Sequence, residues 1–94
     1  PKAPPVSIVK THRKIRELAA EGNYELALEY AEQLLQRYPS HVETMRTKGS
    51  LLLRMGDREA ALKAYQKAQE IEPDRRVEEQ IIKIEKSLSD EGAQ

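Results

Sequence analysis

The chain has 94 residues, of which 38% are hydrophobic and 34% are charged, and its 16 basic residues equal its 16 acidic ones. This length fits one small domain, and the balanced charge provides no overall field that would draw the chain to nucleic acid or to an anionic membrane. The absence of cysteine excludes disulfides, iron–sulfur clusters, thiol catalysis and thiolate-bound zinc. No apolar run approaches the roughly 20 residues that cross a bilayer.

Residues 1–6 form a proline-rich stretch that predicts an extended linker, because proline donates no backbone N–H and restricts the residue before it. The stretch differs from a signal peptide, and the missing initiator Met favours an excised or processed domain. The compartment is therefore left open, with the cytoplasm slightly favoured. Residues 89–94 are polar and predict a disordered tail.

Between these ends, five good N-cap residues each precede a stretch of apolar periodicity, and they predict five helices. The caps are Ser7, Asn23, Ser40, Asp57 and Asp74. The predicted spans are 7–21, 24–37, 41–55, 58–72 and 74–88. Glycine follows the first and third helices, and proline closes the second and fourth. The short connections force neighbouring helices to be antiparallel.

The helix pairs repeat. Gly22 and Gly56 are 34 residues apart, and the same offset relates Pro39 to Pro73. A period of this length with two helices in each period indicates a helical repeat. The sequence thus predicts an all-α domain over residues 7–88, with one repeat at about 7–40, a second at about 41–74, and a capping helix at about 74–88.

The second repeat resembles the tetratricopeptide repeat family. The matching large, small, turn, aromatic and proline slots are filled by Met45, Gly49, Leu52, Gly56, Asp57, Ala61, Tyr65, Ala68 and Pro73. The first repeat matches less well, because Thr11, Ile15 and Ala31 stand in the large, small and aromatic slots. The resemblance implies a right-handed superhelix of antiparallel helix pairs. In it, Gly49 should face Ala61, and Tyr65 should fill the gap to the next unit.

No residue pattern indicates an enzyme, a cofactor or a metal site. His12 and His41 lack the spacing that directs two ligands at one metal ion, and phosphate-binding or nucleophile motifs are absent. The carboxylates fall at helical spacing beside basic residues, which is typical of solvated faces with pairs such as Glu59 with Lys63. The four tyrosines lie on the second helices, where packing is favoured over base stacking.

If the repeats stack as the resemblance implies, the first helix of each pair lines a concave groove. The predicted groove residues are Val9, His12, Arg13, Arg16, Arg46, Thr47, Ser50, Leu53 and Arg54. Arginine can gather carboxylates, so the groove predicts an acidic or extended protein segment as partner. The alternative is that these arginines only solvate a helix face. The family's clamp for chaperone tails lacks its Asn residues and third-helix cations here, so such tails should not bind in that way.

Three functional hypotheses follow. The first is a scaffold or adaptor module that binds a protein or peptide. The second is self-association into a homo-oligomer through an exposed side of the last helix, which would include Val77, Ile81 and Ile84. The third is a non-catalytic appendage of a larger enzyme or transport protein. Nucleic-acid binding is the weakest reading, because the charge is balanced and the tyrosines lie on the wrong faces.

Overall fold

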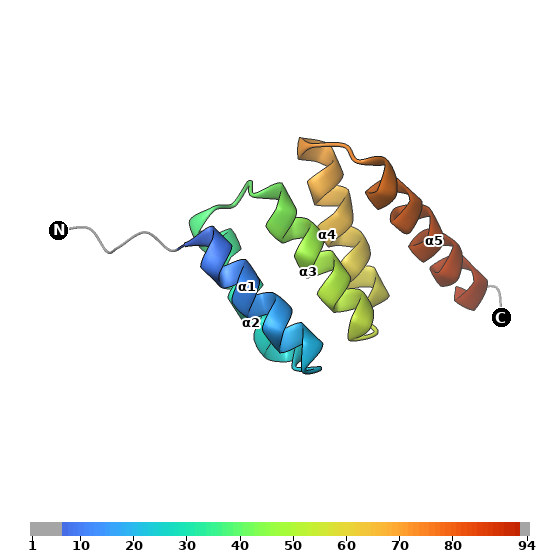
Figure 1. The fold of residues 1–94 in the computed structure, drawn as a ribbon. Helices are drawn as coiled ribbons and strands as arrows, with labels where there is room; N and C mark the ends of the chain where they lie inside the picture. Colours follow the sequence, from blue (N-terminus) through green and yellow to red (C-terminus); the bar gives the residue numbers. More distant parts are fainter. Residues whose placement is uncertain (1–6, 93–94) are drawn as a thin grey trace.

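The computed structural model describes residues 7–92, and within that range it contains five helices and no strand (Figure 1). The helices are α1 (Ile8–Ala20), α2 (Tyr24–Arg37), α3 (Val42–Arg54), α4 (Arg58–Ile71) and α5 (Arg75–Gly92). The predicted all-α class and its antiparallel helix pairs are confirmed. The linker predicted for residues 1–6 lies outside the described residues.

Side-chain caps begin the helices as predicted in four places. The side chains of Ser7, Asn23 and Asp57 accept hydrogen bonds from backbone N–H groups in the first turns of α1, α2 and α4. Asp74 does the same for α5 through the N–H groups of Arg76 and Val77. Each bond satisfies a donor that the helix itself leaves unpaired.

The prediction for the start of α3 was wrong by one residue. His41, rather than Ser40, is the N-cap, and its Nδ1 atom accepts the backbone N–H of Thr44 at 3.3 Å. The backbones after α1 and α3 turn at Gly22 and Gly56, whose φ angles are 81° and 86°. This left-handed conformation is favourable only for glycine, so both turns depend on the residue that the sequence places there.

The hydrophobic core consists of two clusters that meet at α3. The first cluster joins α1 and α2 to Leu51, and it contains Ile15, Leu18, Ala27, Ala31 and Leu34. The second joins α4 and α5 to Leu52, and it contains Ala61, Tyr65, Val77, Ile81 and Ile84. Because adjacent residues of a helix point in different directions, Leu51 and Leu52 contribute to different clusters on two sides of α3. Helix α3 therefore connects the two repeats.

Gly49 on α3 lies directly against the aromatic ring of Tyr65 on α4. A Cβ atom added at this position would lie 2.9 Å from ring atoms of Tyr65. The side chain nearest to Gly49 is thus Tyr65, and the expected pairing of Gly49 with Ala61 stays a prediction. The small residue is required because a buried aromatic ring occupies the space that a side chain would need.

The capping helix differs from the prediction in two respects. Val77, Ile81 and Ile84 are 7%, 6% and 4% exposed, because they pack into the second cluster with α4. They are therefore not an open self-association face. Helix α5 also continues to Gly92, so the predicted tail is helical over residues 89–92, while residues 93–94 lie outside the described range.

The extension of α5 is accompanied by a contact with α4. The guanidinium of Arg58 donates a hydrogen bond to the Ser87 hydroxyl and forms an ion pair with Glu91. This contact anchors the last turns of α5 against the start of α4. A run of polar residues does not by itself end a helix. The glycine of this segment, Gly92, is the last residue of α5.

Candidate functional site

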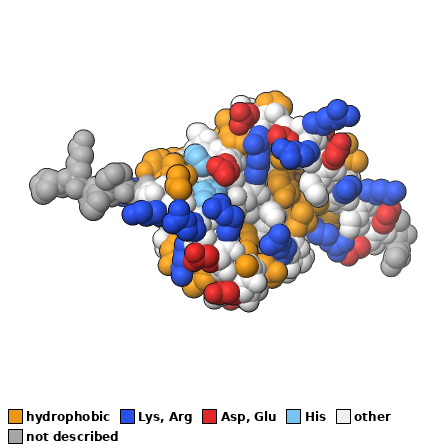
Figure 2. Space-filling model, viewed as in Figure 1, with side chains coloured by type: hydrophobic (Ala, Val, Ile, Leu, Met, Phe, Trp, Pro, Cys, Tyr) orange, Lys and Arg blue, Asp and Glu red, His pale blue; other side chains and the backbone are white. Residues whose placement is uncertain are grey.

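The first helices of the two pairs, α1 and α3, lie in front of α2 and α4 in the view of Figure 1. They form one face of the molecule. Figure 2 shows basic side chains gathered over α1 on this face. The nine predicted groove residues do not all contribute to it, because several are engaged inside the molecule.

Helix α1 supplies the most accessible part of this face. Val9 is 68% exposed, and Arg13 and Arg16 are exposed on the same side of the helix, since residues four and seven positions apart are aligned. Within residues 7–92, neither arginine forms a hydrogen bond or an ion pair. We call Val9, Arg13 and Arg16 the basic face of α1.

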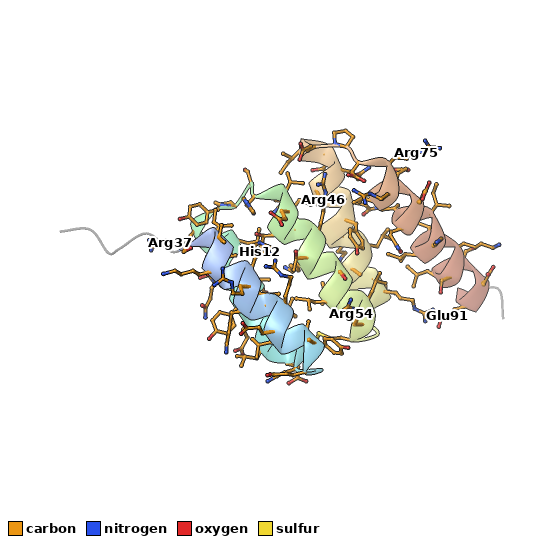
Figure 3. The ribbon with its side chains drawn as sticks, viewed as in Figure 1. His12, Arg37, Arg46, Arg54, Arg75 and Glu91 are labelled. Carbon is orange, nitrogen blue, oxygen red and sulfur yellow. The ribbon has the colours of Figure 1, made fainter. Side chains whose placement is uncertain are left out.

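Arg54 adds a third exposed cation from the end of α3 (Figure 3). Its guanidinium carbon lies 5.9 Å from the centroid of the Tyr24 ring, within the range of a cation–π contact. This contact orients the side chain without neutralising its charge. Arg54 therefore remains able to attract a carboxylate.

His12 was predicted to line the groove, and this was wrong. The side chain is 5% exposed, and its Nε2 atom lies 2.8 Å from the Thr44 hydroxyl. That hydroxyl lies 2.7 Å from Nδ1 of His41. Because Nδ1 of His41 accepts a hydrogen bond from the Thr44 backbone N–H, the Thr44 hydroxyl donates to the same Nδ1 atom and accepts a hydrogen bond from the Nε2–H group of His12. The three side chains form a buried polar link between α1 and α3.

Burial lowers the pKa of His12 below its ordinary value, because the charged imidazolium loses hydration. The carboxylate of Glu43 opposes this change, whereas His41 and Arg16 add to it. His12 thus favours the neutral form that the hydrogen bond to Thr44 can accommodate. The arrangement serves structure rather than ligand contact.

Arg46 is also engaged within the fold (Figure 3). Its Nη2 atom donates to the backbone carbonyl of Glu72 at 2.9 Å and lies 3.6 Å from the carboxylate of the same residue. Glu72 follows α4, so Arg46 fastens α3 to the connection between α4 and α5. Arg46 was predicted to be a cation of the groove. In the described structure its guanidinium instead contacts Glu72.

The other predicted groove residues on α3 are partly buried. The Thr47 hydroxyl donates to the carbonyl of Glu43 in its own helix at 2.9 Å. Ser50 forms a hydrogen bond with Tyr65, whose pKa is raised mainly by burial, while this bond and nearby Arg54 oppose the rise. Leu53 packs against the second cluster. These three side chains make contacts within the fold. The charge of this face therefore comes from Arg13, Arg16 and Arg54.

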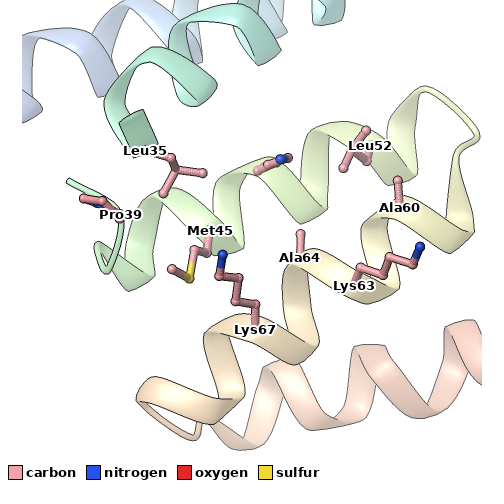
Figure 4. Close-up of a pocket in the computed structure, with 9 residues that line it drawn as sticks. Leu35, Pro39, Met45, Leu52, Ala60, Lys63, Ala64 and Lys67 are labelled. Carbon is pink, nitrogen blue, oxygen red and sulfur yellow. The ribbon is translucent and has the colours of Figure 1, made fainter. Parts of the chain in front are cut away.

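The sequence analysis missed a cavity bounded by α2, α3 and α4. Its volume is about 350 Å³ (Figure 4). The lining contains six apolar residues and three lysines: Leu35, Pro39, Met45, Leu52, Ala60, Ala64, Lys48, Lys63 and Lys67. We call this the lysine-rimmed pocket. The alternation of alanine and lysine at four-residue spacing on α4 was the signal that could have revealed it.

Among residues 7–92, no group of three or more His, Asp or Glu side chains is placed to hold a metal ion. None of the described helices is both long enough and apolar enough to cross a membrane.

Comparison with known proteins agrees with this architecture. A family model described as Tetratricopeptide repeat matches residues 15–83, which run from the middle of α1 to the middle of α5. No curated protein matches the chain. Tetratricopeptide repeats generally mediate protein–protein interactions and are typically non-catalytic. Because the matched segment covers well over half of the chain, the protein belongs to the tetratricopeptide repeat family.

Proposed function

We propose that this module binds an acidic, extended segment of a partner protein along the basic face of α1 and the end of α3. The observation that carries the proposal is the exposure of Arg13 and Arg16 on one side of α1, with no ion pair inside the described molecule. The general role of the family in protein interaction supports the same conclusion.

The chemistry of the face favours carboxylate ligands. Each guanidinium can donate two parallel hydrogen bonds to a carboxylate, and Arg54 extends the cationic surface to α3. Val9 offers an apolar contact beside the two arginines of α1. Because the cations are exposed, the attraction should weaken as salt is added, and it should govern the rate of association more than the final affinity.

A labelled peptide in which glutamate and valine alternate provides a defined probe. We expect the double variant Arg13→Glu, Arg16→Glu to bind it at least tenfold more weakly than the unmodified chain, since losing about 1.4 kcal/mol changes an affinity tenfold. Fluorescence anisotropy at low and high salt measures this change. The peptide should bind the unmodified chain more tightly at low salt.

The matched control is the double variant Lys83→Glu, Lys86→Glu, which makes the same charge change at exposed positions of α5. The control should retain binding. An equal loss in both double variants would show that net charge alone attracts the peptide, and it would contradict a site on α1. Absence of peptide binding by the unmodified chain at low salt would also overturn the proposal.

A further inference from the structure

The lysine-rimmed pocket follows the length of the second helix pair. On α3 it is lined by Met45, Lys48 and Leu52, which lie on one side of the helix. Because an α-helix rises 1.5 Å per residue, the distance from Met45 to Leu52 along α3 is about 10 Å. Figure 4 shows Met45 and Lys67 at one end of the pocket and Leu52 and Ala60 at the other. The pocket is therefore elongated.

The room in the pocket comes from small side chains on α4. Ala60 and Ala64 stand one turn apart, and α4 contributes no larger apolar side chain to the lining. Met45 and Leu52 form a buried floor, with exposed fractions of 3% and 6%. The volume of about 350 Å³ falls within the range of about 300–1,000 Å³ that is typical of small-molecule pockets. The pocket can therefore hold a small apolar group.

The charged residues that line the pocket are all cations. Lys63 and Lys67 form no ion pair among residues 7–92. They stand one helical turn apart on α4, so both ammonium groups can reach the same anion. Lys48 stands across from them on α3, where its ammonium group lies 3.9 Å from the carboxylate of Glu32. The two lysines of α4 thus provide the free charge at the rim.

Two glutamates flank these lysines along α4 without lining the pocket. Glu59 lies four residues before Lys63, and Glu70 lies three residues after Lys67. Over the described part of the chain, neither glutamate forms an ion pair with either lysine. The rim of the pocket therefore remains cationic, whereas its interior is apolar.

We propose that the lysine-rimmed pocket binds an unbranched aliphatic carboxylate of medium chain length. The alkyl chain lies along Met45 and Leu52, where its burial removes apolar surface from water. The carboxylate accepts hydrogen bonds from the ammonium groups of Lys63 and Lys67. A leucine side chain of a peptide is shorter than the pocket, whereas an alkyl chain can follow its whole length. This site is separate from the proposed peptide site, because no residue of α1 lines the pocket.

Isothermal titration calorimetry with decanoate, below the concentration at which it forms micelles, tests the site in the unmodified chain. We expect a dissociation constant of about 10 μM to 1 mM. Each methylene removed from the ligand should weaken binding about fourfold, as expected for a buried methylene. Decyltrimethylammonium has a similar chain and the opposite charge, and it should bind at least tenfold more weakly. Absence of decanoate binding, or equal binding of the two ligands, would overturn the proposal.

Filling the pocket tests its apolar part without a change of charge. Ala64 lines the pocket and is only partly buried, so the larger side chain in Ala64→Leu can project into the empty volume. This variant should bind decanoate at least tenfold more weakly. Ala20→Leu makes the same substitution at the exposed end of α1 and should bind normally. Circular dichroism confirms the fold of both variants before titration.

Neutralising the rim tests the charged part. Lys63→Gln, Lys67→Gln should weaken decanoate binding at least fivefold and should remove the preference for decanoate over decyltrimethylammonium. The matched control is Lys10→Gln, Lys14→Gln, which makes the same charge change at exposed positions of α1. A rim variant that keeps both the affinity and the preference would contradict the assignment of the carboxylate to these lysines.

The variant Arg13→Glu, Arg16→Glu distinguishes this site from the basic face of α1. It should bind decanoate as tightly as the unmodified chain, even where it no longer binds the acidic peptide. If decanoate binding is lost in this variant and kept in Ala64→Leu, the carboxylate binds to α1, and the proposal of a site in the pocket is wrong.

Discussion

The buried ring of Tyr65 determines which residue can stand at position 49. The Tyr65 ring occupies the space beside Gly49, at a distance that no Cβ atom tolerates. Tyr65 is itself held by burial in the second cluster and by a hydrogen bond with Ser50. The ring cannot easily move away, so the glycine is required by packing rather than by backbone conformation.

Gly49→Ala should therefore destabilise the protein. We expect a loss of roughly 1 to 3 kcal/mol in the free energy of unfolding, which is the usual cost of overpacking a core. Urea denaturation measures it. Gly92→Ala is a matched control, because a Cβ atom there meets no neighbour within 4 Å. A Gly49→Ala variant as stable as the control would show that α3 and α4 separate without cost.

His12 gives the stability a dependence on pH. Its pKa in the folded protein is lowered by burial, so the unfolded chain binds a proton more readily than the folded one. The stability should be fully present above the unfolded pKa of about 6.5 and should decline as pH falls below it. The electrostatic influences on His12 come from Glu43, His41 and Arg16.

Thermal melting followed by circular dichroism tests this dependence between about pH 7.5 and about pH 5.5, where ordinary carboxylates stay largely ionised. The melting temperature of the unmodified chain should fall over this range. In His12→Gln, which cannot take up the proton, the fall should be smaller. An identical fall in both proteins would assign the effect to other groups.

At the scale of the helices, one arginine connects three elements. Arg46 extends from α3 to the carbonyl and carboxylate of Glu72, at the point where the chain passes from α4 to α5. The arrangement holds the connection against the end of the helix pair.

Arg46→Ala should cost about 1 kcal/mol in the free energy of unfolding, which is the typical net value of one hydrogen bond. The carboxylate of Glu72 is exposed, so its ion pair with Arg46 should add little to the free energy of unfolding. Chemical denaturation provides the measurement, with Arg13→Ala as the unpaired arginine for comparison. If the two variants are equally stable, the contact with Glu72 does not support the fold.

At the scale of the whole molecule, α3 makes the two repeats interdependent. Leu51 belongs to the first core cluster and Leu52 to the second, so neither repeat completes its core without this helix. Helix α5 then covers the second cluster, which would otherwise face solvent. A repeat unit needs such a cover, because it can bury its apolar side only against a neighbour.

The two binding proposals concern different surfaces of the molecule. The basic face of α1 lies on the first described helix of the array. The lysine-rimmed pocket lies between α2, α3 and α4. The variants that test one surface therefore leave the residues of the other unchanged.

Much of the fold was readable from local signals in the sequence. Cap residues, glycines and prolines predicted the five helices, because each acts on backbone groups only a few residues away. The 34-residue period predicted the pairing of the helices. The two errors at helix ends, at His41 and at Gly92, arose where a competing side chain acted: the imidazole caps α3, and Arg58 holds the end of α5.

The predictions of the site residues failed more often than the predictions of the fold, and the reason is physical. Helical periodicity shows which residues share a side of a helix, but it does not show whether another element covers that side. His12, Arg46 and the apolar residues of α5 were all placed on exposed faces, and tertiary contacts with Thr44, Glu72 and α4 engage them instead.

The sequence by itself therefore determined the helices, the repeat and the family, since these depend on short-range backbone chemistry and on regular spacing. Only the tertiary structure decided which charges remain free, because a charge is free only when no distant residue reaches it. Glu59 and Lys63 illustrate the point: the expected pair is not formed among the described residues, and Lys63 instead stands at the rim of the pocket.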